Sequence, residues 1–292
     1  MSSKLTDYCV INQITGEVEQ WLTHEEKEYL DRNYTSTSPN NSKLNEGNIR
    51  KNSDLFYLFI DEMCGSFYHN YYNNVIPHKY IFRFLYLCTF MNYKGYLEYG
   101  NSKGENRLVN KSNVKEILNL KDQQFYDTYN YFIDNNMIEI NDGYIKINNI
   151  FCNKGKMNNN NNGVVRMFNQ SIKYLYENSN PKEHNKIGMI IKLLPYIHFN
   201  YNIICSNPTE ENDCLIKPLK QKEILEILDI TKPTIASLLK IKILNGTEYA
   251  FIKFSNGSFK NVYVINPRFM FKGNSIDSIE EILPYFKLGL KR

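Results

Sequence analysis

The 292-residue sequence lacks the short motifs that most enzyme classes and metal sites require. It has no Gly-x-x-x-x-Gly-Lys-Ser/Thr loop, which excludes an ATP-driven motor of the phosphate-loop class. It also has no Gly-x-Ser-x-Gly and no His-Glu-x-x-His sequence, so neither a hydrolase serine nor a zinc-protease helix is indicated. The five histidines stand apart, without the His-x-His pair of metal-dependent DNA nickases. We therefore expect no enzyme activity, no cofactor and no metal site.

Long apolar runs and patterned cysteines are missing as well. No stretch approaches the 18 or more apolar residues of a membrane-spanning helix, and the first residues lack the apolar core of a signal peptide. The six cysteines include no Cys-x-x-Cys pair, which disfavours a zinc site. We expect a cytoplasmic protein that does not contact membranes and whose thiols are reduced and mostly buried.

What the sequence does contain is an internal repeat. Three short anchors recur in the same order: Val114–Leu120 with Ile224–Ile230, Ile147–Gly155 with Ile265–Gly273, and Asn92-Tyr93 with Asn200-Tyr201. Their offsets are 110, 118 and 108 residues, and the second pair is identical at five of nine positions. Because a solenoid needs three or more repeats to bury its faces, two copies of about 100 residues indicate two similar domains in tandem.

Each copy has the same order of predicted elements. In the second copy, residue patterns predict helices over 185–199, 219–228 and 233–243, and strands over 249–254 and 259–265. In the first copy they predict helices over 80–91, 112–119 and 122–135, and strands over 137–140 and 144–147. An extra helix precedes each copy, over 54–70 and 165–178. The predicted fold is mostly α with small β wings (α+β), arranged as tandem winged helix-turn-helix domains.

Local signals mark where these helices start and stop. Ser112 and Thr231 are expected N-caps, because a short hydroxyl side chain can satisfy free N–H groups. Pro233 lies in the first turn of its helix, where a missing N–H costs nothing. We expect Asn245-Gly246 to end that helix and Asn141–Gly143 to form the turn of the first wing.

The expected organisation is a polar segment with a β-turn over 1–50, a first domain over 51–157, an Asn-rich flexible linker over 158–164, a second domain over 165–275 and a helical tail over 276–292.

Charge is distributed unevenly among these segments. The net charge is only +4, but residues 166–275 carry fifteen basic and nine acidic side chains. Residues 51–157 carry twelve and eleven. A basic domain favours a nucleic-acid partner, so we expect the second domain to bind double-stranded DNA.

Helix-turn-helix geometry selects the candidate DNA contacts. The exposed start of the third helix enters the major groove, and basic residues around it contact phosphates. The predicted DNA-binding residues of the second copy belong to the second helix and the residues before it (Lys217, Lys220, Lys222), to the third helix and its end (Thr231, Lys232, Thr234, Ser237, Lys240, Lys242) and to the wing (Lys253, Asn256, Ser258, Lys260). Any one of these lysines is more often solvated than bound, so the prediction concerns the cluster.

The third helix of the first copy suits DNA less well. Gln123 and Gln124 can pair with adenine and are included as candidate contacts. Asp122 and Asp127 on the same helix would be repelled by phosphate. The aromatic residues there and in 55–72 favour subunit or interdomain contacts, and we expect a homodimer, or cooperative assembly on DNA, through residues 51–157. The alternative is that residues 55–72 cover the core of their own domain.

Two elements of the sequence resemble a known family. Asn266-Pro-Arg-Phe-Met-Phe-Lys-Gly273 follows the second predicted wing, and Thr15-Gly-Glu17 lies near the start. Both are similar to elements of the RepL replication proteins of Gram-positive plasmids and phages, in which the first closes a winged helix. The tandem arrangement also looks like that of iteron-plasmid initiators, in which one domain dimerises and the other makes most DNA contacts. The second likeness is one of architecture and involves no shared residues.

The resemblance implies a replication initiator. We expect a sequence-specific double-stranded DNA-binding protein that recognises repeats at a plasmid or phage origin and recruits host replication proteins. A winged-helix transcriptional regulator and a plasmid-partition adaptor need the same groove chemistry, so both remain open alternatives.

Overall fold

The computed structural model describes residues 8–11, 18–22, 55–71, 76–100, 106–155, 163–255, 261–273, 279–280 and 282–286. The chain forms two compact units, residues 1–51 and residues 52–292. In the first unit, β1 (Tyr8–Ile11) pairs antiparallel with β2 (Val18–Leu22). The Thr-Gly-Glu segment and the Asn-rich run at 158–162 lie outside the described residues.

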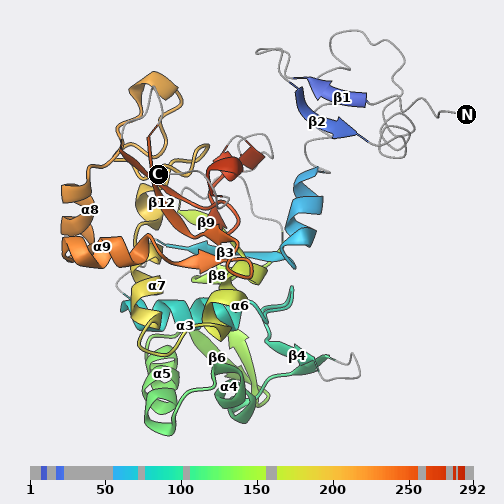
Figure 1. Cartoon of the computed structure of the whole chain (residues 1–292). Helices are drawn as coiled ribbons and strands as arrows, with labels where there is room; N and C mark the ends of the chain where they lie inside the picture. Colours follow the sequence, from blue (N-terminus) through green and yellow to red (C-terminus); the bar gives the residue numbers. More distant parts are fainter. Residues whose placement is uncertain are drawn as a thin grey trace, which may run out of the picture. The chain divides into compact units, whose positions relative to one another are not determined.

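The second unit contains both copies of the repeat (Figure 1). After a helical segment at 55–62, the first half comprises β3 (Ser66–Asn70), α3 (His78–Cys88), β4 (Glu98–Gly100), β5 (Asn106–Leu108), α4 (Lys111–Leu118), α5 (Asp122–Asp134), β6 (Ile138–Asn141), β7 (Tyr144–Ile147) and β8 (Cys152–Asn153). The second half comprises β9 (Val164–Phe168), α6 (Asn169–Glu177), α7 (His184–Ile191), η1 (Leu194–Tyr196), η2 (Asp213–Leu215), α8 (Gln221–Leu228), α9 (Lys232–Leu238), β10 (Lys242–Ile243), β11 (Glu248–Tyr249), β12 (Phe251–Phe254), β13 (Val262–Ile265), β14 (Met270–Phe271) and η3 (Leu283–Phe286).

Four predicted helices are wrong in part. The helix expected over 185–199 ends at Ile191 and is followed by the short 3-10 helix η1. The helix expected over 54–70 ends at residue 62, and β3 follows it; the helix expected over 165–178 begins only at Asn169, after β9. Half-buried and buried side chains alternate along all of β3 and along the first four residues of β9, which is the period of a strand and not of a helix. The helix expected to reach Ile243 ends at Leu238, and Asn245-Gly246, both with positive φ, form the turn between β10 and β11.

A four-stranded antiparallel sheet, in the order β14-β9-β3-β8, joins the two halves. At its centre Tyr68 of β3 lies opposite Arg166 of β9. On the outer side of β3, Tyr68 pairs with Asn153; on the outer side of β9, Arg166 pairs with Phe271. Asn153 and Phe271 are 118 residues apart, which is the offset of the longest sequence anchor. The two copies therefore enter the sheet by the same pairing, related by an approximate two-fold axis.

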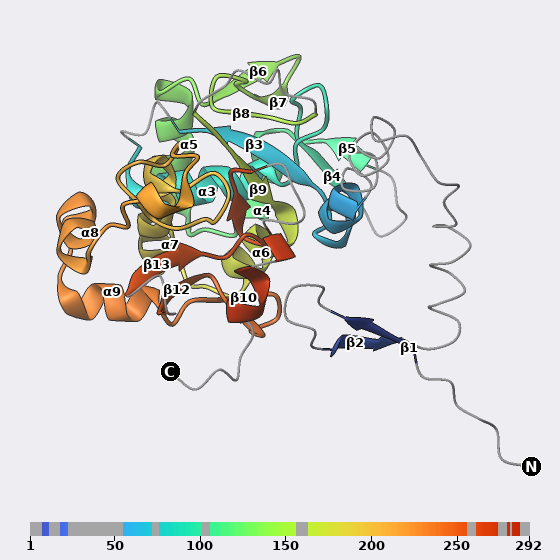
Figure 2. The same ribbon diagram turned by 90° about the horizontal axis from the view of Figure 1, so that it is seen from above.

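The first helices of the two halves, α3 and α7, also pack against each other beside the sheet (Figure 2). Gly188 permits this approach, because a Cβ there would lie 1.9 Å from the carbonyl oxygen of His78. In the same interface Arg83 Nε donates to His184 Nδ1 at 3.2 Å, and Arg83 Nη1 also donates to Thr128 Oγ1 of α5 at 2.6 Å. Burial, with the Arg83 charge second, lowers the pKa of His184 to about 3 and keeps this imidazole neutral.

The repeated asparagine of Ile-Asn-x-x-Phe-x-x-Lys-Gly makes equivalent hydrogen bonds in each half. Asn148 Nδ2 donates to the carbonyl of Asn136 at 2.8 Å, and Asn266 Nδ2 donates to the carbonyl of Tyr249 at 3.0 Å. Each Oδ1 accepts from the backbone N–H two residues further on. These bonds tie the end of the hairpin to the segment that precedes it, which explains why the asparagine occurs in both copies.

The lysine of the same element is equivalent too. Lys154 Nζ donates to the carbonyl of Met91 at 3.0 Å, and Lys272 Nζ donates to that of Ile197 at 3.3 Å. Burial lowers the pKa of both ammonium groups, that of Lys272 to about 8. Both acceptors lie shortly after α3 and α7, so the element fastens each hairpin to the first helix of its own half.

The helix–turn–helix spans coincide as well. Helices α4 and α8 start and end 110 residues apart, and each is followed by a left-handed residue, Asn119 with φ 44° or Asp229 with φ 51°. The predicted N-cap of α4 is wrong by two positions. Asn110 takes that role, with its side chain accepting from the Asn113 N–H, while Ser112 donates its hydroxyl to the Asn110 side chain.

Both predicted hairpins are present. β6 pairs with β7 and β12 pairs with β13, in each case antiparallel. The turn at Asp142-Gly143 has positive φ at both residues, as the Asn-Asp-Gly sequence predicts. Each hairpin also bridges the segment between the first and second helices of its half, through Tyr96 with Lys146 and through Ile203 with Val264.

The molecule is mixed α+β with small antiparallel sheets. Among residues 55–71, Phe56 and Phe59 are buried, but they pack against Phe168 and Phe271 of the second half and not, as the alternative for this segment supposed, in the core of the first copy. Tyr57 and Leu58, 64% and 63% exposed, face outward. Of the cysteines whose side chains are described, three are buried and two are exposed, and all five are free. No helix in the described ranges is long and apolar enough to span a membrane.

Candidate nucleic-acid interface

The α8–α9 unit presents a polar face on a buried apolar base. Ile235 and Leu238 of α9 are buried, with 1% and 0% exposure, and fix the helix against the core. Of the predicted contact residues, Thr231, Lys232 and Lys240 are exposed, whereas Thr234 and Ser237 are half-buried. Thr231 is the N-cap of α9, Lys232, Thr234 and Ser237 lie on the helix, and Lys240 follows its C-cap residue Leu239.

Two of the α9 residues are partly engaged with the helix itself. Thr231 is the N-cap, as predicted, but its hydroxyl lies 3.2 Å from the Thr234 hydroxyl and makes no capping hydrogen bond. Pro233 occupies the first turn. Ser237 Oγ donates to the carbonyl of Thr234 at 2.7 Å. Lys232 is thus the side chain at the start of α9 that is both exposed and unbound within the described part of the chain.

The structure gathers the remaining basic candidates around this unit. Lys217, Lys220, Lys222, Lys242 and Lys253 are all exposed. Lys220, before α8, and Lys253, on β12, line the same pocket of about 790 Å³, although the sequence assigned them to separate elements. Asp213 and Tyr263 line it too. Asn256, Ser258 and Lys260 lie outside the described residues.

These lysines are largely free of carboxylate partners. Within the described ranges, the one ion pair among the predicted lysines joins Lys222 to Glu226 at 3.8 Å, and both side chains are well exposed. Such a pair contributes little and dissociates easily. Glu223 stabilises the start of α8, where its Oε2 accepts from the Lys220 N–H at 2.6 Å. The unpaired ammonium groups make this side of the second half positive and available to an anion.

The equivalent face of the first half is already neutralised. Lys115 pairs with Asp122 at 2.7 Å, and Lys111 lies over the rings of Tyr126 and Tyr129. Gln123, exposed, donates through Nε2 to Asp127 Oδ1 at 2.7 Å. The polar side chains on the exposed face of α5 thus interact with neighbouring side chains of the protein.

Gln124 is poorly placed for the contact proposed from the sequence. Its side chain is half-buried, and its Oε1 is buried without a hydrogen-bond partner in the described part of the molecule. Recognition of adenine needs both the oxygen and the nitrogen of the amide. Gln124 would have to change rotamer before it could pair with a base.

One residue near the interface was missed by sequence reasoning. Lys186, on the first turn of α7, lines a pocket with Ser237, Lys240 and Lys242. The apolar period of Ile187, Ile190 and Ile191 placed Lys186 on the outer face of its helix, but nothing in the sequence showed that α7 begins next to the end of α9.

No protein-family model, curated protein or solved structure matches this chain.

Proposed function

We propose that this chain is a sequence-specific double-stranded DNA-binding protein in which each half is a winged helix-turn-helix, and that the second half makes most of the contacts. In this proposal α9 enters the major groove and the β12–β13 hairpin is a wing beside it. Lys232 and Thr234 contact base edges, and the lysines around α8, α9 and the hairpin contact phosphates.

The observation that supports this most strongly is the exposed, unpaired basic face around α9. Nucleic-acid affinity depends mainly on cations that can neutralise phosphates, and among the described candidate lysines of the second half only Lys222 has an ion pair, the exposed one with Glu226. The three-residue turn with a left-handed first residue, Asp229, orients α9 away from α8. The hairpin then follows in the order that a winged helix requires.

We further propose that the protein initiates replication of a plasmid or phage by binding repeats at an origin. The RepL-like ending Asn266–Gly273 supports this role. It closes the second hairpin, with Asn266 bonded to Tyr249 and Glu248 and with Met270 in the central sheet. Self-association on adjacent repeats and recruitment of host replication proteins belong to the same proposal.

Footprinting of the full-length protein on the DNA that flanks its gene tests both parts. Discrete protected repeats, retained in excess non-specific competitor, are expected for sequence-specific binding. Uniform protection that the competitor abolishes would contradict it. A minimal plasmid carrying only the gene and the protected repeats should then replicate. If the repeats are bound but the plasmid is not maintained, replication is refuted and a regulator or partition adaptor is left.

A further inference from the structure

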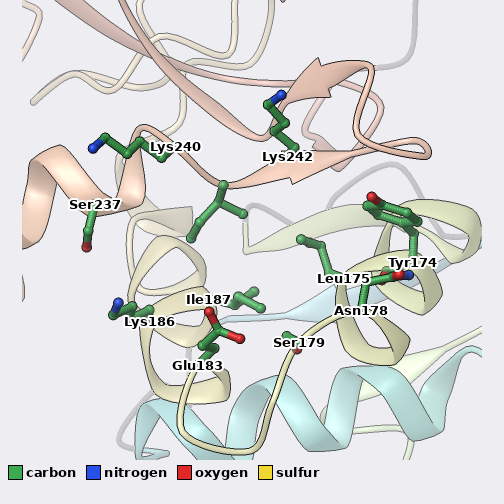
Figure 3. A pocket seen from close by; sticks show the side chains of 11 residues that line it. Tyr174, Leu175, Asn178, Ser179, Glu183, Lys186, Ile187, Ser237, Lys240 and Lys242 are labelled. Atoms are coloured by element: carbon green, nitrogen blue, oxygen red, sulfur yellow. The ribbon is translucent and has the colours of Figure 1, made fainter.

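A second pocket shares no lining residue with the one that contains Lys220 and Lys253. It has a volume of about 350 Å³ and lies between α6, the start of α7 and the end of α9. Leu175 and Ile187 give it an apolar floor. Figure 3 shows Lys186, Ser237 and Lys240 on one side of it, with both ammonium groups directed outward, away from Leu175 and Asn178.

The charge at this side of the pocket favours an anion. Lys186 and Lys240 are exposed, and neither has an ion pair within the described ranges. Lys242, on the rim, turns its ammonium group away from the pocket in Figure 3 and lies over the Tyr249 ring at 5.7 Å. The positive charge that a ligand would meet therefore comes from α7 and α9 together.

Glu183 is the acidic group in this pocket, and its charge is partly compensated. Its Oε2 accepts from the backbone N–H of Asn180 at 2.9 Å and from Asn180 Nδ2 at 2.8 Å. These bonds hold the carboxylate in the turn that precedes α7. The side with Lys186 and Lys240 thus remains the place where an anion is best accommodated.

We propose that Lys186 and Lys240 bind a phosphate group of the DNA backbone. This inference rests on the proposed function and assigns a DNA contact to α7, outside the helix-turn-helix. A helix in the major groove has one phosphate backbone on each side. In this proposal Lys220 and Lys253 contact one backbone, and Lys186 and Lys240 contact the other.

Acetylation footprinting of the full-length protein tests this assignment. Lysines are modified with an N-hydroxysuccinimide ester and read by mass spectrometry, alone and with a random duplex of about 30 base pairs, roughly three helical turns. The duplex should protect Lys186 and Lys240 together with Lys232, but not Lys182, which is exposed and outside the pocket. A parallel titration with inorganic pyrophosphate distinguishes a free phosphate compound from DNA.

Each outcome decides between the two proposals. Protection of Lys232 without Lys186 overturns the backbone contact and leaves DNA binding by α9 intact. If the duplex protects neither, both proposals fail. If pyrophosphate protects Lys186 and the duplex does not, the pocket binds a free phosphate compound instead.

A pair of matched variants gives the energetic test. Lys186→Gln should weaken binding about three- to tenfold for any sequence and reduce the salt dependence by about 0.9 per lost phosphate contact. Lys182→Gln removes the same charge nearby and should leave both quantities nearly unchanged. Equal losses of affinity in the two variants would mean that Lys186 acts only through the net charge of the protein, and would overturn the assignment.

Discussion

Helices α4 and α5 of the first half start 110 residues before α8 and α9 of the second, yet the exposed charged side chains of the two units differ. In the first, Lys115 pairs with Asp122. In the second, Lys232 and Lys240 are exposed and unpaired within the described residues. The difference shows that the repeat preserves what builds the fold, while the solvent-facing positions differ and carry the proposed function.

The two halves also differ at some buried positions around the repeated asparagine. Asn148 and Asn266 make the same backbone contacts, but Asn266 is fully buried and also donates to Glu248 at 2.9 Å. Glu248, 3% exposed, pairs with Arg268 at 2.7 Å. At the position equivalent to Arg268 the first half has Ile150, 54% exposed. Among the described residues, the second half therefore contains a buried ion pair, Glu248 with Arg268, that the equivalent positions of the first half do not form, and Arg268 also reaches Glu62 at 3.4 Å.

The largest expected effect comes from breaking this ion pair. Arg268→Ala should lower the free energy of unfolding by about 3–5 kcal/mol, because it leaves the buried Glu248 carboxylate without its cation. Ile150→Ala, at the equivalent exposed position, should change it by at most about 0.5 kcal/mol. Urea unfolding of the full-length variants gives both values. Similar losses in the two variants would show that the halves are not stabilised differently.

The next effect concerns recognition of DNA. The double variant Lys232→Ala with Thr234→Ala should lose about 1–3 kcal/mol of preference for the footprinted site over random duplex. Lys253→Ala should weaken binding to both duplexes alike, because a phosphate contact reads no sequence. Gln123→Ala, on the equivalent helix of the first half, should change neither. Competition binding measures all three, and a comparable loss of preference in Gln123→Ala would assign base contacts to α5 as well.

A pH effect of similar size distinguishes two equivalent histidines. His78 and His184 begin α3 and α7, and burial lowers the pKa of each, that of His184 to about 3. Below the unfolded value of about 6.5, the unfolded chain binds a proton that the folded His184 does not, so stability falls as pH falls. At pH 5 the loss is about 2 kcal/mol relative to neutral pH, from a slope of about 1.4 kcal/mol per pH unit.

His184→Gln should therefore flatten the decline of stability between pH 7 and pH 4, whatever it does to stability at pH 7. His78→Gln should flatten it less, since the His78 side chain is less buried than that of His184. Unfolding by urea at several pH values gives the two slopes. An unchanged slope in His184→Gln would mean that the imidazole is protonated in the folded protein.

Local patterns predicted much of the repeated scaffold. Helix α5, both hairpins and the three-residue turns follow from apolar period, from Asp142-Gly143 and from the spacing of the anchors. The central sheet did not follow, because β3 and β9 are short strands whose partners lie about 100 residues away, and pairing at that range leaves no local signal. The Asn92-Tyr93 anchor is slightly out of register: His198, not Asn200, accepts the turn N–H groups as Asn92 does.

The candidate site was predictable in composition but not in arrangement. The lysines of α8 and α9 could be read from the helix-turn-helix pattern, since exposure follows from helical period. Lys220 and Lys253 line one pocket, and Lys240 and Lys186 line another. Which lysines share a pocket depends on how distant elements pack. The shared sheet also means that a fragment containing only the second half would leave β9 without β3, so DNA binding is best compared in variants of the full chain.

The smallest expected effect tests whether the first half faces DNA at all. Asp122→Asn with Asp127→Asn removes two negative charges from the exposed face of α5 and releases Lys115 from its ion pair. If α5 is directed away from the duplex, affinity should rise by less than about twofold, because screening at physiological salt confines a charge's influence to about 8 Å. Fluorescence anisotropy at constant salt measures this, with Asp134→Asn, also exposed and at the other end of α5, as the matched control. A rise of about tenfold in the double variant, absent from the control, would place the start of α5 against a phosphate backbone and make the first half a second reader of the site.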